Sequence, residues 1–221
     1  MSELRRVLIG TPALDGRVDC WYSDSMFDSI KVGLYVGINI IPSILHNESI
    51  LPMSRNELIR SAVLNEVESL VFIDSDEQWQ PQALIDLINS PYDVHGLPVI
   101  NKSDEKEAYN VRLLDLNNIE RDGDGNIVAN GIGTGFLKIS QKALRALWDC
   151  HEDVYFRGKT LKAICEYGQV GNEFVSEDYN LCNKLRAAGF PIWVSTKHTV
   201  SHRGTKTWHG NFEEYLKTVT G

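Results

Sequence analysis

The sequence predicts an α/β fold with a mostly parallel central sheet flanked by helices. Short apolar runs alternate with amphipathic segments through the first hundred residues, an order typical of βαβ units. The run at 70–73 is continuously apolar, as strands buried on both faces are, and it ends in Asp74-Ser75-Asp76. With 221 residues, of which 43% are hydrophobic, the chain is long enough for one domain with a substantial core.

The first half of the chain is expected to supply the parallel strands and the helices between them. Strands are expected at 6–10, 37–41, 70–73 and 92–97, and helices at 24–32, from Ser54 and from Pro81. Thr11-Pro12 is a breaker pair that ends the first strand. Ser54 fits an N-cap with Glu57 at the capping-box position, and Pro81 suits the first turn of a helix.

The second half is expected to carry a β-hairpin insertion besides further strands and helices. Strands are expected at 110–116, 126–129, 136–139 and 191–194, and helices at 141–148 and 176–188. Asp122-Gly123-Asp124-Gly125 provides the turn of the hairpin, and Gly189 fits a C-cap for the last helix. No linker or repeat divides the chain, so residues 1–221 are predicted to form one domain.

Composition and charge argue against several classes of protein. The formal net charge of −8 disfavours broad nonspecific binding to nucleic acid, although it leaves room for a local basic groove. The four cysteines show no CxxC pair and no metal-ligand spacing, so they are interpreted as reduced thiols. There is no secretory signal and no apolar run of membrane-spanning length, so a cytoplasmic protein without a membrane partner is predicted.

Asp74 and Asp76 are the first candidates for a functional site. Side chains of a strand alternate between its faces, so both carboxylates are expected on one side at the carboxyl end, where open α/β sheets bind ligands. Two such carboxylates repel each other unless a proton or a cation lies between them. Oxygen ligands favour Mg²⁺ or Mn²⁺, which commonly hold phosphate as well. The alternative interpretation is a solvated turn with an N-cap.

Two further clusters each allow two interpretations. Gly131, Gly133 and Gly135 precede a strand rather than a helix, so the dinucleotide-binding fingerprint fails, and they permit either close approach to a ligand or a tight turn. Ser176-Glu177-Asp178 begins a helix, where a serine cap and acidic residues complement the helix dipole. In the functional interpretation, Asp178 is a general base that takes a proton from an acceptor hydroxyl.

Basic residues and histidines suggest sites for an anion and a metal. Arg55-Asn56, at the start of a helix, can present a guanidinium and a helix N-terminus to a diphosphate. His202-Arg203-Gly204 gathers positive charge where a phosphate can bind, and His202 or His198 can ligate a metal through a neutral nitrogen. Lys102 is interpreted either as a contact to phosphate or acceptor, or as a solvated loop residue.

The order of these landmarks resembles that of GT-A-fold glycosyltransferases, in particular small stand-alone members such as those encoded by bacteriophages. The resemblance runs from Val7 to about Gly210 and rests on Thr11-Pro12, Ser54-Arg55-Asn56, Phe72-Ile73-Asp74-Ser75-Asp76, Gly133-Thr134-Gly135-Phe136, Ser176-Glu177-Asp178-Tyr179 and His202-Arg203-Gly204. It implies a single GT-A-like domain with a nucleotide-binding half at about 1–102 and an acceptor-binding half at about 103–221.

The resemblance implies metal-dependent transfer of a sugar from a nucleotide-sugar donor, expected to be a UDP-sugar, to an acceptor hydroxyl. Asp76 and His202 would coordinate Mn²⁺ or Mg²⁺, and Asp74 would reach the metal or the nucleotide ribose. Asp178, with Glu177 beside it, would be catalytic and would act as the base if the reaction inverts the anomeric centre. The other implied donor-binding residues are Thr11, Pro12, Arg55, Asn56, Ser75, Thr134 and Gly135.

The acceptor and the reaction class leave alternatives. The resemblance to phage-encoded members implies a hydroxymethylated pyrimidine in DNA as one acceptor, which requires a flipped-out base and a local basic channel. A nucleotidyltransferase acting on a sugar phosphate also uses paired carboxylates and a metal, and a non-catalytic nucleotide-sugar binding module would keep the pocket without turnover. The segments 165–174 and 205–211 are either lids over the substrate or surface loops. No particular oligomeric state is predicted.

Overall fold

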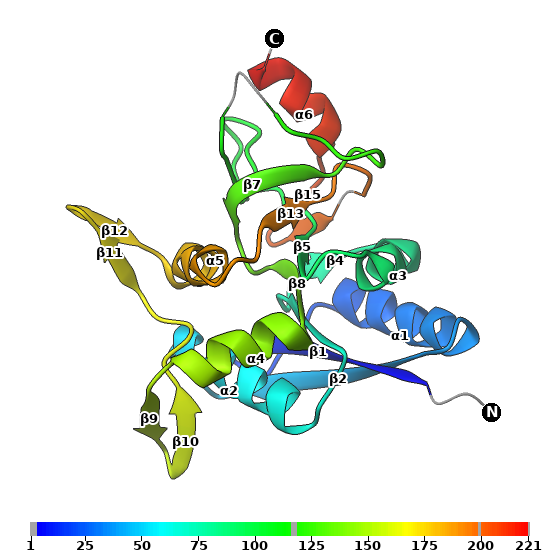
Figure 1. Cartoon of the computed structure of the whole chain (residues 1–221). Coiled ribbons are helices and arrows are strands. Elements are labelled where there is room, and N and C mark those ends of the chain that lie inside the picture. Colours follow the sequence, from blue (N-terminus) through cyan, green and yellow to red (C-terminus); the bar gives the residue numbers. More distant parts are fainter. Residues whose placement is uncertain (1–3, 116–118, 199, 221) are drawn as a thin grey trace.

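An eight-stranded mixed sheet forms the centre of the protein, with helices on both of its faces (Figure 1). The computed structural model describes residues 4–115, 119–198 and 200–220. The strand order is β2-β1-β3-β8-β5-β13-β7-β6, and β7 and β8 run opposite to the other six strands. This arrangement confirms the predicted α/β class with a largely parallel sheet.

The elements have the following bounds. The main sheet contains β1 (Arg5–Ala13), β2 (Ile38–His46), β3 (Ser69–Ile73), β5 (Val94–Gly96), β6 (Val111–Leu113), β7 (Ile127–Ile132), β8 (Phe136–Ser140) and β13 (Ile192–Val194). Smaller sheets contain β4 (Glu77–Gln78), β14 (Ser201–Arg203) and β15 (Thr207–Trp208), then β9 (Asp153–Phe156) and β10 (Lys159–Lys162), then β11 (Gly168–Val170) and β12 (Glu173–Val175). The helices are α1 (Cys20–Tyr35), α2 (Leu51–Leu64), α3 (Pro81–Asn89), α4 (Gln141–Cys150), α5 (Glu177–Ala187) and α6 (Phe212–Val219). None of these helices is both long and apolar enough to cross a membrane.

The helices cover the sheet in two layers. On one face α1 and α3 pack against each other, and Met26 and Leu84 join Ile9 of β1 in a buried cluster. On the other face α2, α4 and α5 contribute to a second buried cluster, which includes Leu58 and Leu144. Burial of apolar surface on both faces explains why the central strands are apolar throughout.

β3 leads directly into the candidate site. All five of its residues are buried, and it pairs in parallel with β1 and antiparallel with β8. The parallel register of β1 and β3 brings their carboxyl ends to the same edge of the sheet, so Pro12 and Asp74 emerge side by side. This is the edge at which α/β sheets bind ligands.

β1 continues beyond the predicted breaker pair. The prediction that Thr11-Pro12 ends the strand is wrong, since β1 pairs in parallel with β2 as far as Ala13. Pairing with β3 already stops at Gly10, so the last three residues of β1 have a ladder partner on one side. Proline is tolerated in a strand where one side lacks a ladder partner.

α2 begins earlier than predicted. The helix starts at Leu51 with Pro52 in its first turn, and Ile50 is the N-cap without a side-chain hydrogen bond. The predicted cap at Ser54, and with it the capping box to Glu57, is therefore wrong. Pro52 suits the first turn because no intrahelical donor is needed there, and Ser54 is buried within the helix.

The predicted hairpin forms one edge of the main sheet. β6 and β7 pair antiparallel, and Asp122 organises the turn by accepting the Asn126 N–H at Oδ1 (2.8 Å). The strand predicted at 110–116 is shorter than expected, and residue 116 lies outside the described residues.

Two more hairpins, β9–β10 and β11–β12, project from the body and were not predicted as strands (Figure 1). Most of their residues are exposed or half-buried, so an alternating apolar pattern does not mark them. The segment 165–174, interpreted from the sequence as either a lid or a surface loop, contains β11 and the start of β12, shortly before α5.

Candidate functional site

Asp74-Ser75-Asp76 forms the turn between β3 and β4 rather than the end of a strand. Alternation of strand side chains therefore does not place the two carboxylates, because the Glu77 N–H closes a turn onto the Asp74 carbonyl (3.3 Å). The Asp74 N–H donates to the Gly135 carbonyl (3.0 Å), which ties the turn to the start of β8. A Cβ on Gly135 would lie 3.1 Å from Glu77 Oε1 and 3.3 Å from Asp74 Oδ2, so glycine leaves room for both carboxylates.

A small antiparallel sheet brings a histidine to this turn from the C-terminal part of the chain. β4 follows the turn and pairs with β14, which pairs in turn with β15. The register places His202 opposite Glu77. Asp76, Glu77 and His202 thereby form a group in which one ligand atom of each lies within 4.8 Å of the others.

A backbone carbonyl orients the ring of His202. His202 Nδ1 lies 2.9 Å from the Ile100 carbonyl oxygen, and because a carbonyl only accepts, Nδ1 carries the proton. Nε2 then faces the carboxylates, 3.6 Å from Asp76 Oδ2 and 3.9 Å from Glu77 Oε1. Metal-binding histidines are commonly held by such a hydrogen bond on the other ring nitrogen. His198, the alternative ligand, binds Asp86 instead (2.8 Å).

The chemistry of this group fits a divalent cation. Burial and repulsion from Asp74 and Asp76 raise the pKa of Glu77 well above its usual value. Glu77 Oε2 is buried and has no hydrogen-bond partner among the described residues. Burial also opposes ionisation of Asp76, but the proximity of His202 and Lys102 lowers its pKa to about 2. An unpartnered carboxylate oxygen, an ionised carboxylate and an imidazole nitrogen are together suited to Mn²⁺ or Mg²⁺.

Arg55 and Asp74 form a polar pair next to this group. Arg55 is 3% exposed, and its Nη2 lies 3.5 Å from Asp74 Oδ1. Its Nε and Nη1 are buried without a hydrogen-bond partner in the described part of the chain. Burial raises the pKa of Asp74, while the positive charge of Arg55 acts against that shift. Unpaired donors on a buried guanidinium favour an anionic ligand such as a phosphate.

A cavity of about 270 Å³ opens beside Arg55. Its lining comes from the end of β1, the β2–α2 connection, the start of α2 and the turn after β3, and it includes the predicted residues Pro12, Arg55, Asp74, Ser75 and Asp76. Glu48 also lines it and pairs with Arg157 in the β9–β10 turn (2.8 Å). The structure thus brings a cavity, a buried guanidinium and the metal-ligand group together at one edge of the sheet.

Four predicted donor-binding residues, Thr11, Asn56, Thr134 and Gly135, are not among the residues that line this cavity. The Thr11 hydroxyl lies 2.6 Å from the Tyr22 hydroxyl. Both ends of the Asn56 amide bind the backbone of Cys165, at 2.9 and 2.7 Å. Thr134 is 1% exposed, and its hydroxyl has no hydrogen-bond partner among the described residues.

Asp178 lies in the first turn of α5. Its carboxylate accepts from the hydroxyl of the N-cap residue Ser176 and from the Tyr179 N–H (2.9 Å). Glu177 beside it is buried, whereas Asp178 is half-buried. Besides burial and Asp76, the charge of Asp178 raises the pKa of Asp74, so this helix start acts electrostatically on the same site.

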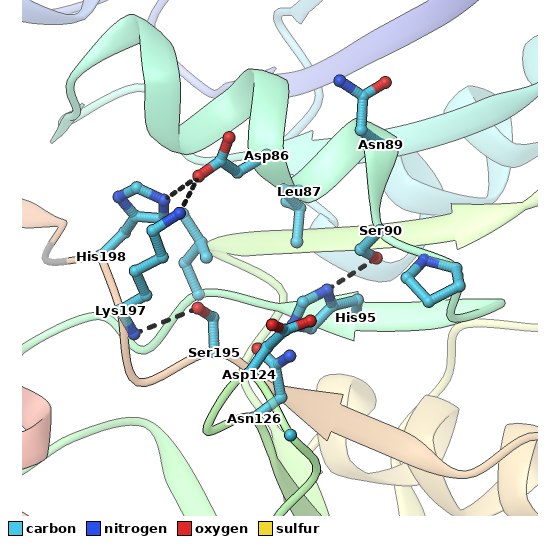
Figure 2. A pocket seen from close by; sticks show the side chains of 13 residues that line it. Asp86, Leu87, Asn89, Ser90, His95, Asp124, Asn126, Ser195, Lys197 and His198 are labelled. Atoms are coloured by element: carbon cyan, nitrogen blue, oxygen red, sulfur yellow. Dashed lines mark hydrogen bonds and ion pairs between the residues drawn. The ribbon is translucent and has the colours of Figure 1, made fainter.

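A larger cavity, of about 590 Å³, lies beside α3, β5 and the segment after β13 (Figure 2). Its basic groups pair with a lining carboxylate, since Asp86 binds both Lys197 (2.7 Å) and His198 (2.8 Å). His95 binds Ser90 Oγ through Nδ1 (2.7 Å), and burial lowers its pKa to about 4, so it is neutral near pH 7. This cavity shares no lining residue with the smaller one, and its internally paired charges make it a poor site for a diphosphate.

One residue of the site was not singled out by a sequence motif. Glu77 joins the group through the pairing of β4 with β14, although a third carboxylate directly after Asp74-Ser75-Asp76 is a usable signal. Lys102, for which the sequence left two interpretations, lies in a partly exposed loop with its Nζ 2.5 Å from Asp76 Oδ2.

No protein-family model matches the sequence, and no curated protein sequence matches it. Among solved structures, the crystal structure of A197 from STIV is similar with a TM-score of 0.52 and 15% identity, over 91% of this chain and 86% of that one. The crystal structure of GalNAc-T7 with UDP, GalNAc and Mn²⁺ has a TM-score of 0.50 and 11% identity over 90% of this chain. This chain has a GT-A-like fold. It spans 44% of the GalNAc-T7 chain, and at these identities the similarity shows the fold alone.

Replacing Glu77 by Gln is expected to stabilise the metal-free protein and to weaken metal binding. Because folding raises the pKa of Glu77, ionisation of this carboxylate at neutral pH destabilises the folded state, and a neutral amide removes that effect. The melting temperature of metal-free E77Q should rise by a few degrees, since about 1 kcal/mol corresponds to about 2–4 °C in a domain of this size. Added Mn²⁺ should no longer raise it.

Asp76→Asn is the matched variant, and its melting temperature is expected to change in the opposite direction to that of E77Q. Folding lowers the pKa of Asp76 to about 2, so its ionised form adds stability above the unfolded pKa of about 3.9, and this stability is lost as the pH falls toward 2. Metal-free D76N should therefore melt below the wild type at pH 7. Equal melting temperatures for the two variants, or an unchanged Mn²⁺ response in E77Q, would contradict the assignment of Glu77.

Proposed function

We propose that this chain is a metal-dependent glycosyltransferase that moves a sugar from a UDP-sugar to an acceptor hydroxyl. The observation that carries the proposal is the group of Asp76, Glu77 and His202 beside a cavity lined in part by Arg55, a buried guanidinium whose Nε and Nη1 have no hydrogen-bond partner among the described residues. A nucleoside diphosphate matches both features, because its phosphate oxygens bind a guanidinium and a metal at once. The GT-A-like fold, which GalNAc-T7 shares in a complex with UDP, GalNAc and Mn²⁺, supports this class of ligand.

The diphosphate is expected to lie between Arg55 and the metal-ligand group. Arg55 would donate from Nε and Nη1 to phosphate oxygens, while Asp74 holds the guanidinium at Nη2. Pro12 and Ser75 line the same cavity and would border the nucleoside. Asp74 is close enough to the cavity to accept a hydrogen bond from the ribose as well. Thr11 and Asn56 support this wall through their contacts with Tyr22 and Cys165.

Asp76, Glu77 and His202 would hold Mn²⁺ or Mg²⁺. A bound ion supplies positive charge where the departing diphosphate gains negative charge. His202 is prepared for this role because the Ile100 carbonyl keeps the proton on Nδ1 and leaves Nε2 to face the ion. Glu77 is prepared because its Oε2 has no competing partner among the described residues.

Asp178 is the proposed base for the acceptor hydroxyl. Ser176 and Tyr179 hold one of its carboxylate oxygens, Oδ1, which leaves the other to take the proton. Glu177, buried beside it, would fix the start of the helix. Thr134 and Gly135, at the start of β8, would border the sugar, since Gly135 lies against both Glu77 and Asp74.

In the presence of Mn²⁺ and without an acceptor, the protein is expected to release UDP slowly from at least one UDP-sugar. Asp76→Ala removes a metal ligand and should lower the rate by about a hundredfold or more, as loss of charge stabilisation in the transition state does. Asp86→Ala, in the larger cavity, is the matched carboxylate variant and should keep the wild-type rate. A coupled assay that detects UDP across a panel of UDP-sugars measures this.

Other products would point to the other classes. Release of pyrophosphate from a nucleoside triphosphate and a sugar 1-phosphate would identify a nucleotidyltransferase. Tight binding of UDP-sugars with no turnover, across an acceptor panel that includes DNA carrying hydroxymethylated pyrimidines, would identify a binding module.

Asp178→Asn is expected to preserve donor binding and to reduce transfer by about a hundredfold or more, the usual effect of losing a general base. The amide oxygen can still accept from Ser176 and Tyr179, so the start of α5 should stay intact. The comparison of donor Kd with the rate of transfer measures this, with Glu173→Gln on the exposed β12 as a control. Unchanged transfer in D178N would remove Asp178 from the mechanism.

A further inference from the structure

The ammonium group of Lys102 lies next to Asp76, the carboxylate at which a divalent cation would also bind. Its Nζ lies 2.5 Å from Asp76 Oδ2, the same oxygen that lies 3.6 Å from His202 Nε2. The Lys102 side chain is 33% exposed and that of Asp76 is 40% exposed, so the pair is shielded in part from solvent. The positive charge of Lys102 therefore acts on the oxygen that belongs to the metal-ligand group.

The segment that carries Lys102 is ordered by its own hydrogen bonds. Ile100 forms a bridge with Tyr109, and the Asn101 N–H donates to the Ala108 carbonyl (2.8 Å), which closes the loop between them. Ile100 is also the residue whose carbonyl orients His202. One short segment thus orients the ring of His202 through Ile100 and carries the ammonium group of Lys102.

The aliphatic part of Lys102 lies beside Gly204. A Cβ at Gly204 would lie 3.5 Å from Lys102 Cδ, which is ordinary van der Waals contact. The lysine side chain is therefore packed against the backbone of this loop on its way to Asp76.

An ammonium group and a divalent ion at the same carboxylate oxygen compete electrostatically. Lysine has donors but no lone pair, so it cannot join the metal as a ligand, and the two like charges repel each other. Binding of a metal at Asp76 Oδ2 therefore favours movement of the Lys102 ammonium away from this oxygen.

We propose that Lys102 is a built-in counter-ion that competes with the divalent cation for Asp76 and couples metal binding to nucleoside diphosphate binding. Without nucleotide, the ammonium neutralises Asp76 and keeps metal affinity low. With nucleotide, the displaced ammonium binds a phosphate oxygen, so the two ligands strengthen each other's binding. The coupling is reciprocal, since each ligand must change the affinity for the other by the same factor. This inference rests on the proposed binding of a nucleoside diphosphate at this site.

Lys102→Gln tests the proposal through the Kd of Mn²⁺, measured on the whole protein by electron paramagnetic resonance of free Mn²⁺. Without nucleotide, K102Q should bind Mn²⁺ roughly 5- to 20-fold more tightly than the wild type, on the scale of coupling between close charge pairs. Addition of UDP should then tighten Mn²⁺ binding by a smaller factor in K102Q than in the wild type, because the phosphate loses its ammonium partner.

Two further variants separate this role from a general change in charge. Lys102→Arg keeps the charge at Asp76 and should keep Mn²⁺ affinity at or below that of the wild type. Lys206→Gln removes a neighbouring positive charge that pairs with Asp104 and should change the Kd by no more than about twofold, since exposed charges are screened by salt.

Each outcome has a distinct meaning. If the wild type binds Mn²⁺ and K102Q binds it equally or less tightly, the counter-ion role is wrong and the proposed function stands. If K102Q and K206Q tighten binding equally, the effect is net charge and the inference is overturned as well. If neither the wild type nor K102Q binds Mn²⁺ with or without UDP, both the inference and the proposed metal-dependent function fail.

Discussion

The pairing of β4 with β14 is the interaction on which the candidate site depends. These two short strands lie outside the main sheet, and their register alone places His202 opposite Glu77. The Arg203 N–H extends this contact by donating to the Asp76 carbonyl (2.8 Å). A shift of one residue would turn His202 to the other side of the strand, because side chains alternate between its faces. The main sheet supplies the turn after β3, and this small sheet brings His202 to the carboxylates of that turn.

The electrostatics of the site indicate a fold that gives up stability for binding. Burial and neighbouring acids disfavour the ionised forms of Glu77 and Asp74, and the partners that offset this are Arg55, Lys102 and His202. Buried groups of this kind are typical of binding sites, where the missing partner is a ligand. Next to the cavity the group that lacks partners carries the opposite charge: it is the guanidinium of Arg55, whose Nε and Nη1 have no hydrogen-bond partner among the described residues. A metal beside the carboxylates and a phosphate beside the guanidinium would satisfy both.

Motifs in the sequence predicted the α/β class and the strand before Asp74, because apolar runs are local signals. The proximity of Arg55 and His202 to the aspartates was implied by the family resemblance, and the structure brings both side chains to them. The start of α2 was misjudged, since the helix begins at Leu51 after Ile50, an N-cap residue without a side-chain hydrogen bond, and Pro52 rather than Ser54 marks its first turn. The sequence did not assign a role to Glu77 and left two interpretations for Lys102, because the partners of both residues are determined by contacts between distant segments. A register between a two-residue strand and a three-residue strand leaves no periodic trace in the sequence.

Anomalous X-ray diffraction from crystals grown with Mn²⁺ and UDP tests the central claim most directly. We expect one strong anomalous peak within about 2.3 Å of oxygens from Asp76 and Glu77 and of His202 Nε2, with the diphosphate between it and Arg55. A peak bound by other side chains, or UDP bound away from Arg55 with no metal at these three residues, would contradict the proposed site.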